Sequence, residues 1–206
     1  MWARRITYLL THFMRWFGDH WLALANLAVA LYIGLPVLAP VLLHAGHERL
    51  AGAIYVIFKP LCHQLPERSY FLYGPQAVYS YDELSAFLGG LVPRRYLGAA
   101  EIGYKLAVCQ RCVAIYGSML LDGLAFVLLR RRLKPLPIKG FLAMLLPIAV
   151  DGLGQLFHLW TSSWWSRLIT GGVFGLAIVW LTYPYLEQGM REVSLAARKT
   201  LQDWKG

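Results

Sequence analysis

The sequence predicts an all-α integral membrane protein with four transmembrane helices, and two observations favour this class. Hydrophobic residues make up 58% of the 206 residues and charged residues only 15%, a balance more apolar than that of ordinary soluble domains. Four runs of roughly 20 residues, the length that crosses a bilayer, carry almost no charge. The net charge of +9 lies mainly at the ends of these runs, which is typical of membrane insertion. We therefore expect a lipid bilayer as partner and no nucleic acid.

The elements follow one another as a single membrane domain, 1–206. Residues 1–20 carry apolar side chains at helical spacing, so we expect an amphipathic helix on the inner leaflet. The predicted transmembrane spans are 21–43, 106–129, 140–160 and 168–186. The outer loop 44–105 contains an apolar segment, 50–61, that is about half the length of a span. We interpret it as a re-entrant or interfacial helix, the alternative being a buried helix of a small extramembrane cap. Residues 187–206 form an amphipathic cytoplasmic tail.

Lysine and arginine residues set the expected orientation, because short basic loops resist translocation. The strongest basic block of the chain lies within residues 130–139, between the second and third predicted spans. We expect this loop in the cytoplasm. With four spans, both termini then also lie in the cytoplasm, and the protein is a multi-pass protein of the cytoplasmic (inner) membrane.

Two aspartates interrupt the apolar spans. Asp122 and Asp151 both stand in the pattern Asp-Gly-Leu, and the helical rise places them at similar depth on consecutive spans. Charged groups inside a bilayer are costly and are functional candidates by default. A shared proton, a bound cation or an arginine partner would make them tolerable, and the alternative is that hydroxyl groups of the bundle hydrogen-bond each one.

Further polar residues extend this region toward the outer end of the third span. Asp151, Gln155 and His158 are spaced i, i+4 and i+7, which predicts one helix face. Arg167 opens the fourth span on the same side. We expect these four residues, together with Asp122, to line a polar intramembrane pocket, and the four are the candidate catalytic groups.

The three cysteines all lie on the predicted outer side. Cys109 and Cys112 form a Cys-x-x-Cys pair where the second span begins, and Cys62 is followed by His63. Three cysteines and a histidine are the ligand set of a tetrahedral zinc or iron site. His158 reaches the level of Cys112, so it is the alternative fourth ligand.

The chemistry of such a site depends on the number of protein ligands. With three, the open position would activate water in a metal-dependent membrane enzyme; with four, the metal would be structural. Arg68 and Arg111 would offset the thiolate charge or hold a lipid head group or small anion.

Three other interpretations stay open. Cys109 and Cys112 with Cys62 as resolving thiol would suit a membrane thiol-disulfide oxidoreductase. In a transporter or an accessory subunit of a membrane complex, the aspartates would carry protons or cations and the cysteines would brace the long loop. The third is that the thiols are buried without a role. A homo-oligomer or a larger membrane complex is among the expected assemblies.

Several motifs resemble those of one family. They are Cys-His-Gln-x-Pro-x-Arg-Ser at 62–69, Cys-x-Arg-Cys at 109–112 and Asp-Gly-x-x-Gln at 151–155. This ordered set resembles a family of small prokaryotic predicted membrane proteins that is named only as a domain of unknown function. The resemblance runs from about Leu50 to Gly172 and implies that the motif residues belong together. It implies no biochemical activity.

Overall fold

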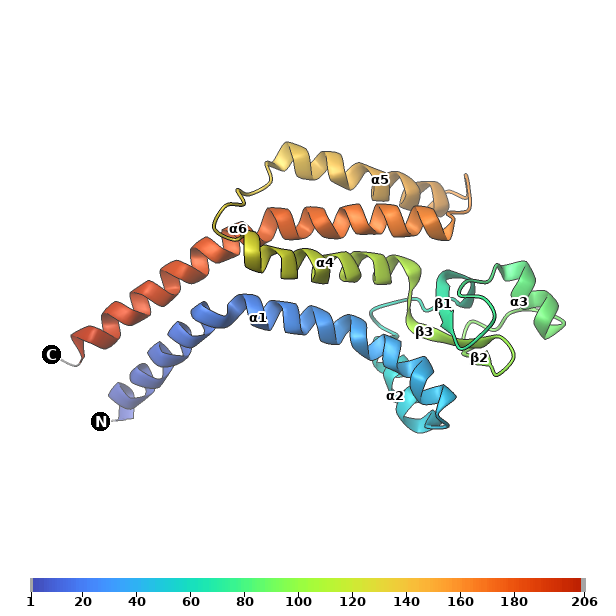
Figure 1. Ribbon diagram of the computed structural model, residues 1–206, viewed down its shortest axis with the longest axis horizontal. Helices are drawn as coiled ribbons and strands as arrows, with labels where there is room; N and C mark the ends of the chain where they lie inside the picture. Colours follow the sequence, from blue (N-terminus) through green and yellow to red (C-terminus); the bar gives the residue numbers. More distant parts are fainter. Residues whose placement is uncertain (1, 205–206) are drawn as a thin grey trace.

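The protein is a helical bundle with a small sheet at one end (Figure 1). The computed structural model describes residues 2–204. Within this range four helices are long and apolar enough to cross a membrane, which confirms the predicted fold class. The elements in chain order are α1 (Trp2–His44), α2 (Glu48–Phe58), the 3-10 helix η1 (Pro66–Arg68), β1 (Ser69–Leu72), α3 (Tyr81–Leu88), β2 (Gly98–Ala99), β3 (Gly103–Cys109), α4 (Gln110–Leu129), α5 (Ile138–Leu156) and α6 (Trp164–Asp203).

The first and last helices are much longer than one span. α1 has 43 residues and α6 has 40, so the expected amphipathic ends continue the spans without a break. No proline interrupts residues 2–20, and the helical pattern therefore runs on. The two extensions run beside each other away from the bundle (Figure 1). Arg198 of α6 donates to both carboxylate oxygens of Asp19 of α1 at 2.9 Å, and this ion pair links the two extensions.

The sheet was not expected from the sequence. Its three antiparallel strands have the order β1-β3-β2. β3 takes up the first four residues of the predicted span 106–129, so α4 begins at Gln110. Residues 105–109 of β3 are all buried, and residues 106–109 are apolar, so this part of the strand was predicted as the start of a transmembrane span. In the register of the sheet, Ser69 of β1 lies opposite Cys109 of β3.

The short apolar segment forms α2, a helix of 11 residues. One face, with Ala51, Tyr55 and Phe58, is buried in a hydrophobic cluster that includes residues of α1 and β3. The other face exposes Val56 and Ile57. At 1.5 Å per residue the helix is about 16 Å long, too short to span the hydrocarbon core.

Small residues bring α4 and α6 into close contact. A Cβ atom on Gly171 would lie 2.8 Å from the Cβ of Ala114. One on Gly175 would overlap the hydroxyl of Ser118 and the backbone oxygen of Ile115. This spacing of small residues is what allows helices to approach in lipid, where no hydrophobic force drives them together.

We therefore expect Gly175→Ala to destabilise the protein by about 1–3 kcal/mol, the usual cost of overpacking. Gly172→Ala is the matched control, because a Cβ at Gly172 meets nothing within 4 Å. Thermal unfolding of the purified variants in detergent measures both. Equal melting temperatures for the two variants would contradict the assigned contact.

Candidate functional site

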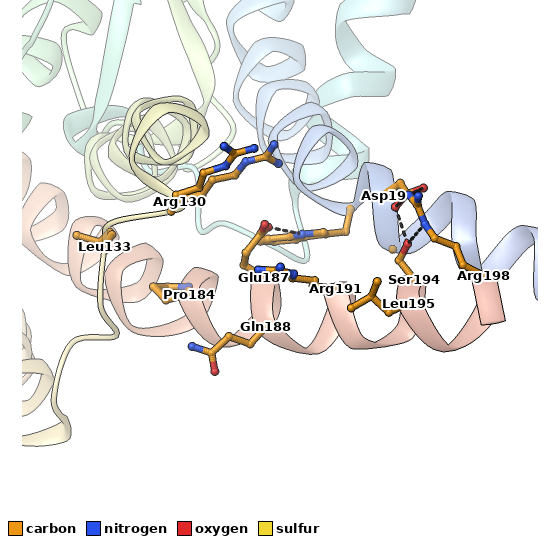
Figure 2. Close-up of a pocket in the computed structure, with 13 residues that line it drawn as sticks. Asp19, Arg130, Leu133, Pro184, Glu187, Gln188, Arg191, Ser194, Leu195 and Arg198 are labelled. Carbon is orange, nitrogen blue, oxygen red and sulfur yellow. Dashed lines mark hydrogen bonds and ion pairs between the residues drawn. The ribbon is translucent and has the colours of Figure 1, made fainter.

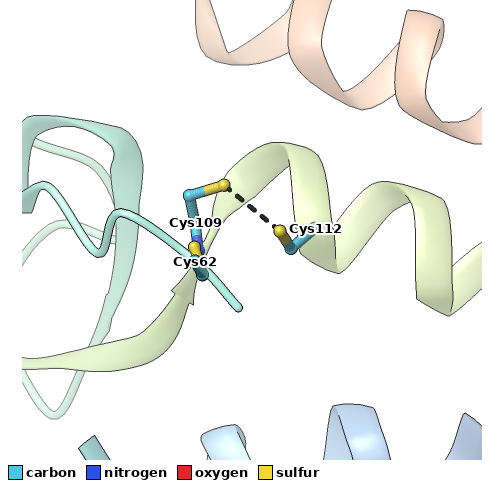
Figure 3. A group of neighbouring side chains, drawn as sticks. All are labelled: Cys62, Cys109 and Cys112. Atoms are coloured by element: carbon cyan, nitrogen blue, oxygen red, sulfur yellow. Dashed lines mark hydrogen bonds between the residues drawn. The ribbon is translucent and has the colours of Figure 1, made fainter. Parts of the chain in front are cut away.

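The three cysteines meet where β3 becomes α4 (Figure 3). Cys109 ends β3, Cys112 lies in the first turn of α4, and Cys62 follows α2. Their Sγ atoms all lie within 4.8 Å of one another, and those of Cys109 and Cys112 are 3.6 Å apart. The backbone N–H of Cys109 donates to Cys62 Sγ at 3.2 Å. Hydrogen bonds from the thiols of Cys109 and Cys112 lower the pKa of Cys62, which favours a thiolate there.

Buried polar contacts hold the turn that carries Cys62. The side chain of Gln64 donates to the backbone oxygen of Tyr55 at 2.9 Å, and Gln64 has a positive φ of 51°. The ammonium of Lys105 donates to the backbone oxygen of Gln64. Lys105 is 1% exposed, and this burial lowers its pKa to about 8. Lys105 was not among the predicted site residues, although a lysine inside the apolar run 102–108 was a signal of a buried polar contact.

The two candidate histidines lie outside the group of sulfur atoms. His63 is exposed, and its Nδ1 accepts a hydrogen bond from the backbone N–H of Leu65 at 3.1 Å. The prediction that His158 shares a helix face with Asp151 and Gln155 is wrong. α5 ends at Leu156, and His158 has a positive φ of 56° and is exposed.

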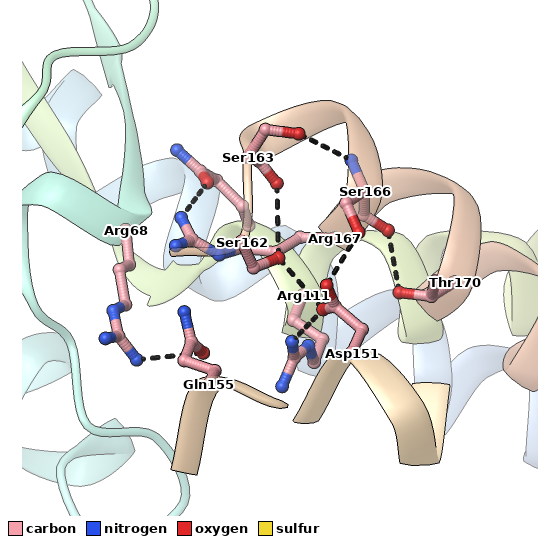
Figure 4. A network of polar contacts seen from close by, with 10 residues as sticks. Arg68, Arg111, Asp151, Gln155, Ser162, Ser163, Ser166, Arg167 and Thr170 are labelled. Carbon is pink, nitrogen blue, oxygen red and sulfur yellow. Dashed lines mark hydrogen bonds and ion pairs between the residues drawn. The ribbon is translucent and has the colours of Figure 1, made fainter. Parts of the chain in front are cut away.

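Asp151 is the centre of a polar network that joins three helices (Figure 4). Its carboxylate forms an ion pair with Arg111 of α4. It also accepts hydrogen bonds from the hydroxyls of Ser162 at 2.9 Å and Ser166 at 2.7 Å. Asp151 is 6% exposed, so these partners replace the water that a carboxylate needs. An arginine partner and hydroxyl groups were two of the expected alternatives for this aspartate, and both are present.

A second chain of contacts connects the sheet to α5 and α6. Arg167 donates to the side-chain oxygen of Gln110 at 2.9 Å, and Gln110 in turn donates to the backbone oxygen of Ser69 at 3.2 Å. Arg68 donates to the side-chain oxygen of Gln155 at 3.2 Å. The motif that ends at Ser69 is therefore tied to both helices. Gln110 was not predicted as a site residue, because a glutamine at the start of a helix is common in proteins and does not by itself indicate a functional role.

A cavity of about 290 Å³ joins the two groups of residues. The three cysteines line it together with Arg68, Arg111, Gln155 and Arg167. Asp122 is not among the residues that line it, and its Oδ2 has no hydrogen-bond partner among the described residues. The structure thus gathers the cysteines and arginines of the sequence motifs around one cavity, together with His63 and Gln155. Asp122, Asp151 and His158, which were predicted to belong to the pocket or the metal site, do not line it.

A larger cavity, of about 750 Å³, lies at the other end of the bundle (Figure 2). No cysteine or histidine is among the described residues that line it. Its acidic groups already have partners: Trp21 donates to Glu187 at 3.0 Å, and Arg198 pairs with Asp19. Among the described residues, this cavity therefore has fewer buried polar atoms without a hydrogen-bond partner than the cavity beside the cysteines.

Fold and site together define a multi-span helical membrane protein with a cysteine cluster at one end of its bundle. Residues 101–181 match a family described as "Predicted membrane protein (DUF2085)". Over 133 residues the chain is 29% identical to "Uncharacterized protein MJ1492" of Methanocaldococcus jannaschii, covering 64% of this chain and 67% of that protein. No solved structure matches the chain. The resemblance to a family of predicted membrane proteins, expected from the motifs, is confirmed.

The two Asp-Gly-Leu patterns provide a matched pair for testing the network. Asp151→Asn should destabilise the protein by about 1–3 kcal/mol, because it leaves the Arg111 guanidinium without a counter-charge. Asp122→Asn should change stability by less than about 0.5 kcal/mol, since its Oδ2 loses no hydrogen bond. Chemical unfolding in detergent compares them. A larger loss for Asp122→Asn would refute this assignment.

Proposed function

We propose that Cys62, Cys109 and Cys112 bind a zinc or iron ion at the outer face of the membrane. The observation that carries this proposal is the spacing of the sulfur atoms, 3.6 Å for one pair and at most 4.8 Å for all. With metal–sulfur bonds of about 2.3 Å, tetrahedral geometry separates two sulfurs by about 3.8 Å. Only small side-chain adjustments are needed to meet that value.

The hydrogen bond at His63 favours three protein ligands over four. Its Nδ1 accepts from the N–H of Leu65, so the proton of the neutral ring is on Nε2. A protonated nitrogen is not a metal ligand, and His63 would have to change tautomer to become one. A metal with three protein ligands keeps an open position, at which a bound water is activated. We infer a metal-dependent membrane enzyme in which Cys62, Cys109 and Cys112 would hold the metal and Arg68 and Arg111, which line the same cavity as the cysteines, would bind an anionic substrate group.

The proposed orientation places the cysteine cluster outside the cytoplasm. The basic loop 130–134 and both ends of the described chain are at one end of the bundle, and the cluster is at the other (Figure 1). Short basic loops favour the cytoplasmic side. The protein is then a multi-pass protein of the cytoplasmic membrane with both termini in the cytoplasm.

Elemental analysis tests the metal centre. The purified protein, prepared without chelator, should contain about one equivalent of zinc or iron, and Cys62→Ser, Cys109→Ser and Cys112→Ser should each reduce it to below about a tenth. Leu61→Ser introduces the same residue beside the cluster and should retain the metal, as should His63→Ala. A folded wild-type protein that takes up neither metal after anaerobic reconstitution would refute the proposal.

A thiol-disulfide oxidoreductase is the second candidate, because 3.6 Å between Cys109 Sγ and Cys112 Sγ is close enough for the pair to oxidise after a small movement. The same samples separate the two functions. A metal-free protein whose Cys109 and Cys112 become reversibly resistant to alkylation on oxidation would support this function instead of the first.

Fusion reporters test the orientation. Green fluorescent protein fused after Gly206 should fluoresce, and alkaline phosphatase inserted at Ser85 in α3 should be active only if that helix is outside. Reciprocal fusions, with the two reporters exchanged, should both be silent. Active reciprocal fusions would reverse the proposed topology.

A further inference from the structure

We propose that the cavity beside the cysteines binds a phosphoryl group through Arg68, Arg111 and Arg167. The group is either inorganic phosphate or the phosphomonoester head group of a lipid. This inference deepens the proposed metal site, on which it rests for its chemistry, by naming the class of ligand.

Three buried donors without acceptors belong to residues that line this one cavity. They are Nε of Arg111, Nε2 of Gln155 and Nε of Arg167, none of which has a hydrogen-bond partner among the described residues. Arg167 is only 8% exposed. A buried donor that lacks an acceptor costs free energy, and native proteins contain few of them. A ligand rich in acceptor oxygens would remove this cost.

The charges around the cavity are unbalanced in the same direction. Three guanidinium groups line it, and only one of them, that of Arg111, forms an ion pair among the described residues, with Asp151. Arg68 and Arg167 donate to the neutral amides of Gln155 and Gln110 instead. Even with one thiolate at Cys62, positive charge remains in excess. Partly buried like charges repel strongly, because the surrounding dielectric constant is low.

Helix polarity adds to the excess of positive charge. Arg111 lies in the first turn of α4 and Arg167 at the start of α6, and neither helix has an acidic residue in its first turn. The N-terminal end of a helix is electropositive, so cations there are unfavourable and anions are stabilised. The positive ends of α4 and α6 therefore repel the arginines that lie there. A bound anion would be attracted both to the arginines and to the two helix ends.

The size and geometry of the cavity select the kind of anion. Its volume of about 290 Å³ equals that of roughly ten water molecules in the liquid, which suits one phosphoryl group with its hydration. The guanidinium groups come from η1, α4 and α6, so their donors approach from three elements. Guanidinium forks match the oxygens of phosphate in pairs. A tetrahedral phosphoryl group also has enough oxygen atoms to accept hydrogen bonds from all three arginines.

Phosphate titration with a charge-matched pair of variants tests the site. Wild-type protein in phosphatidylcholine nanodiscs is titrated with inorganic phosphate by calorimetry, with sodium chloride held constant. Arg68→Gln should weaken binding about tenfold or more, since it removes a charge-assisted hydrogen bond. Arg94→Gln removes the same charge from an exposed residue that does not line the cavity, and it should change the dissociation constant less than about twofold.

A second arm distinguishes the source of the phosphoryl group. Nanodiscs containing phosphatidic acid are exchanged with the protein, and retained lipid is counted by native mass spectrometry for the same variants. Retention of phosphatidic acid that depends on Arg68, with no binding of inorganic phosphate, identifies the lipid head group. Arg68-dependent binding of inorganic phosphate identifies the free anion. No binding in either arm, or binding that Arg68→Gln leaves unchanged, overturns the proposal.

Metal content measured on the same samples separates this inference from the proposed function. A metal-loaded protein that binds no phosphoryl group overturns the anion site and leaves the metal centre in place. A metal-free protein that binds phosphate with the expected dependence on Arg68 overturns the metal centre alone. Circular dichroism checks the fold of each variant, and Arg68→Lys, which keeps the charge, is the second variant if Arg68→Gln is unfolded.

Discussion

The pairing of β1 with β3 is the constraint on which the site depends. It sets Ser69 opposite Cys109, so the end of the first motif lies beside the start of the second. β3 then passes directly into α4, and Cys109 is at once the last residue of the strand and the N-cap of the helix. No loop separates Cys109 from Cys112, so the strand and the helix set the positions of these two residues relative to each other. Cys62, 47 residues before Cys109, is joined to this junction by the hydrogen bond from the backbone N–H of Cys109 to its Sγ atom.

Much of the fold was predictable because lipid imposes simple rules. A span must be apolar for about 20 residues, and the four long helices follow from that length alone. The gathering of Cys62 with Cys109 and Cys112 was also expected, from their placement at one end of the spans. The sheet was not predictable, since residues 105–109 of β3 are all buried and the strand resembles a continuation of the apolar span.

The misplacement of His158 has a similarly local cause. Helical spacing places it with Asp151 and Gln155, but spacing says nothing of where a helix ends. α5 ends at Leu156, and the backbone then enters the left-handed region at His158. The two Asp-Gly-Leu patterns also look alike in sequence. Only the structure separates Asp151, with an arginine and two serines as partners, from Asp122.

The length of the first and last helices has a consequence for what surrounds the bundle. At 1.5 Å per residue, α1 and α6 extend for about 60 Å, whereas the hydrocarbon layer is only about 30 Å thick. Roughly half of each helix must then lie among head groups or in water. The two extensions are joined by the ion pair of Asp19 with Arg198 and are continuous with the helices of the bundle. A small tilt of the bundle in the membrane would therefore produce a large displacement of the far ends of α1 and α6.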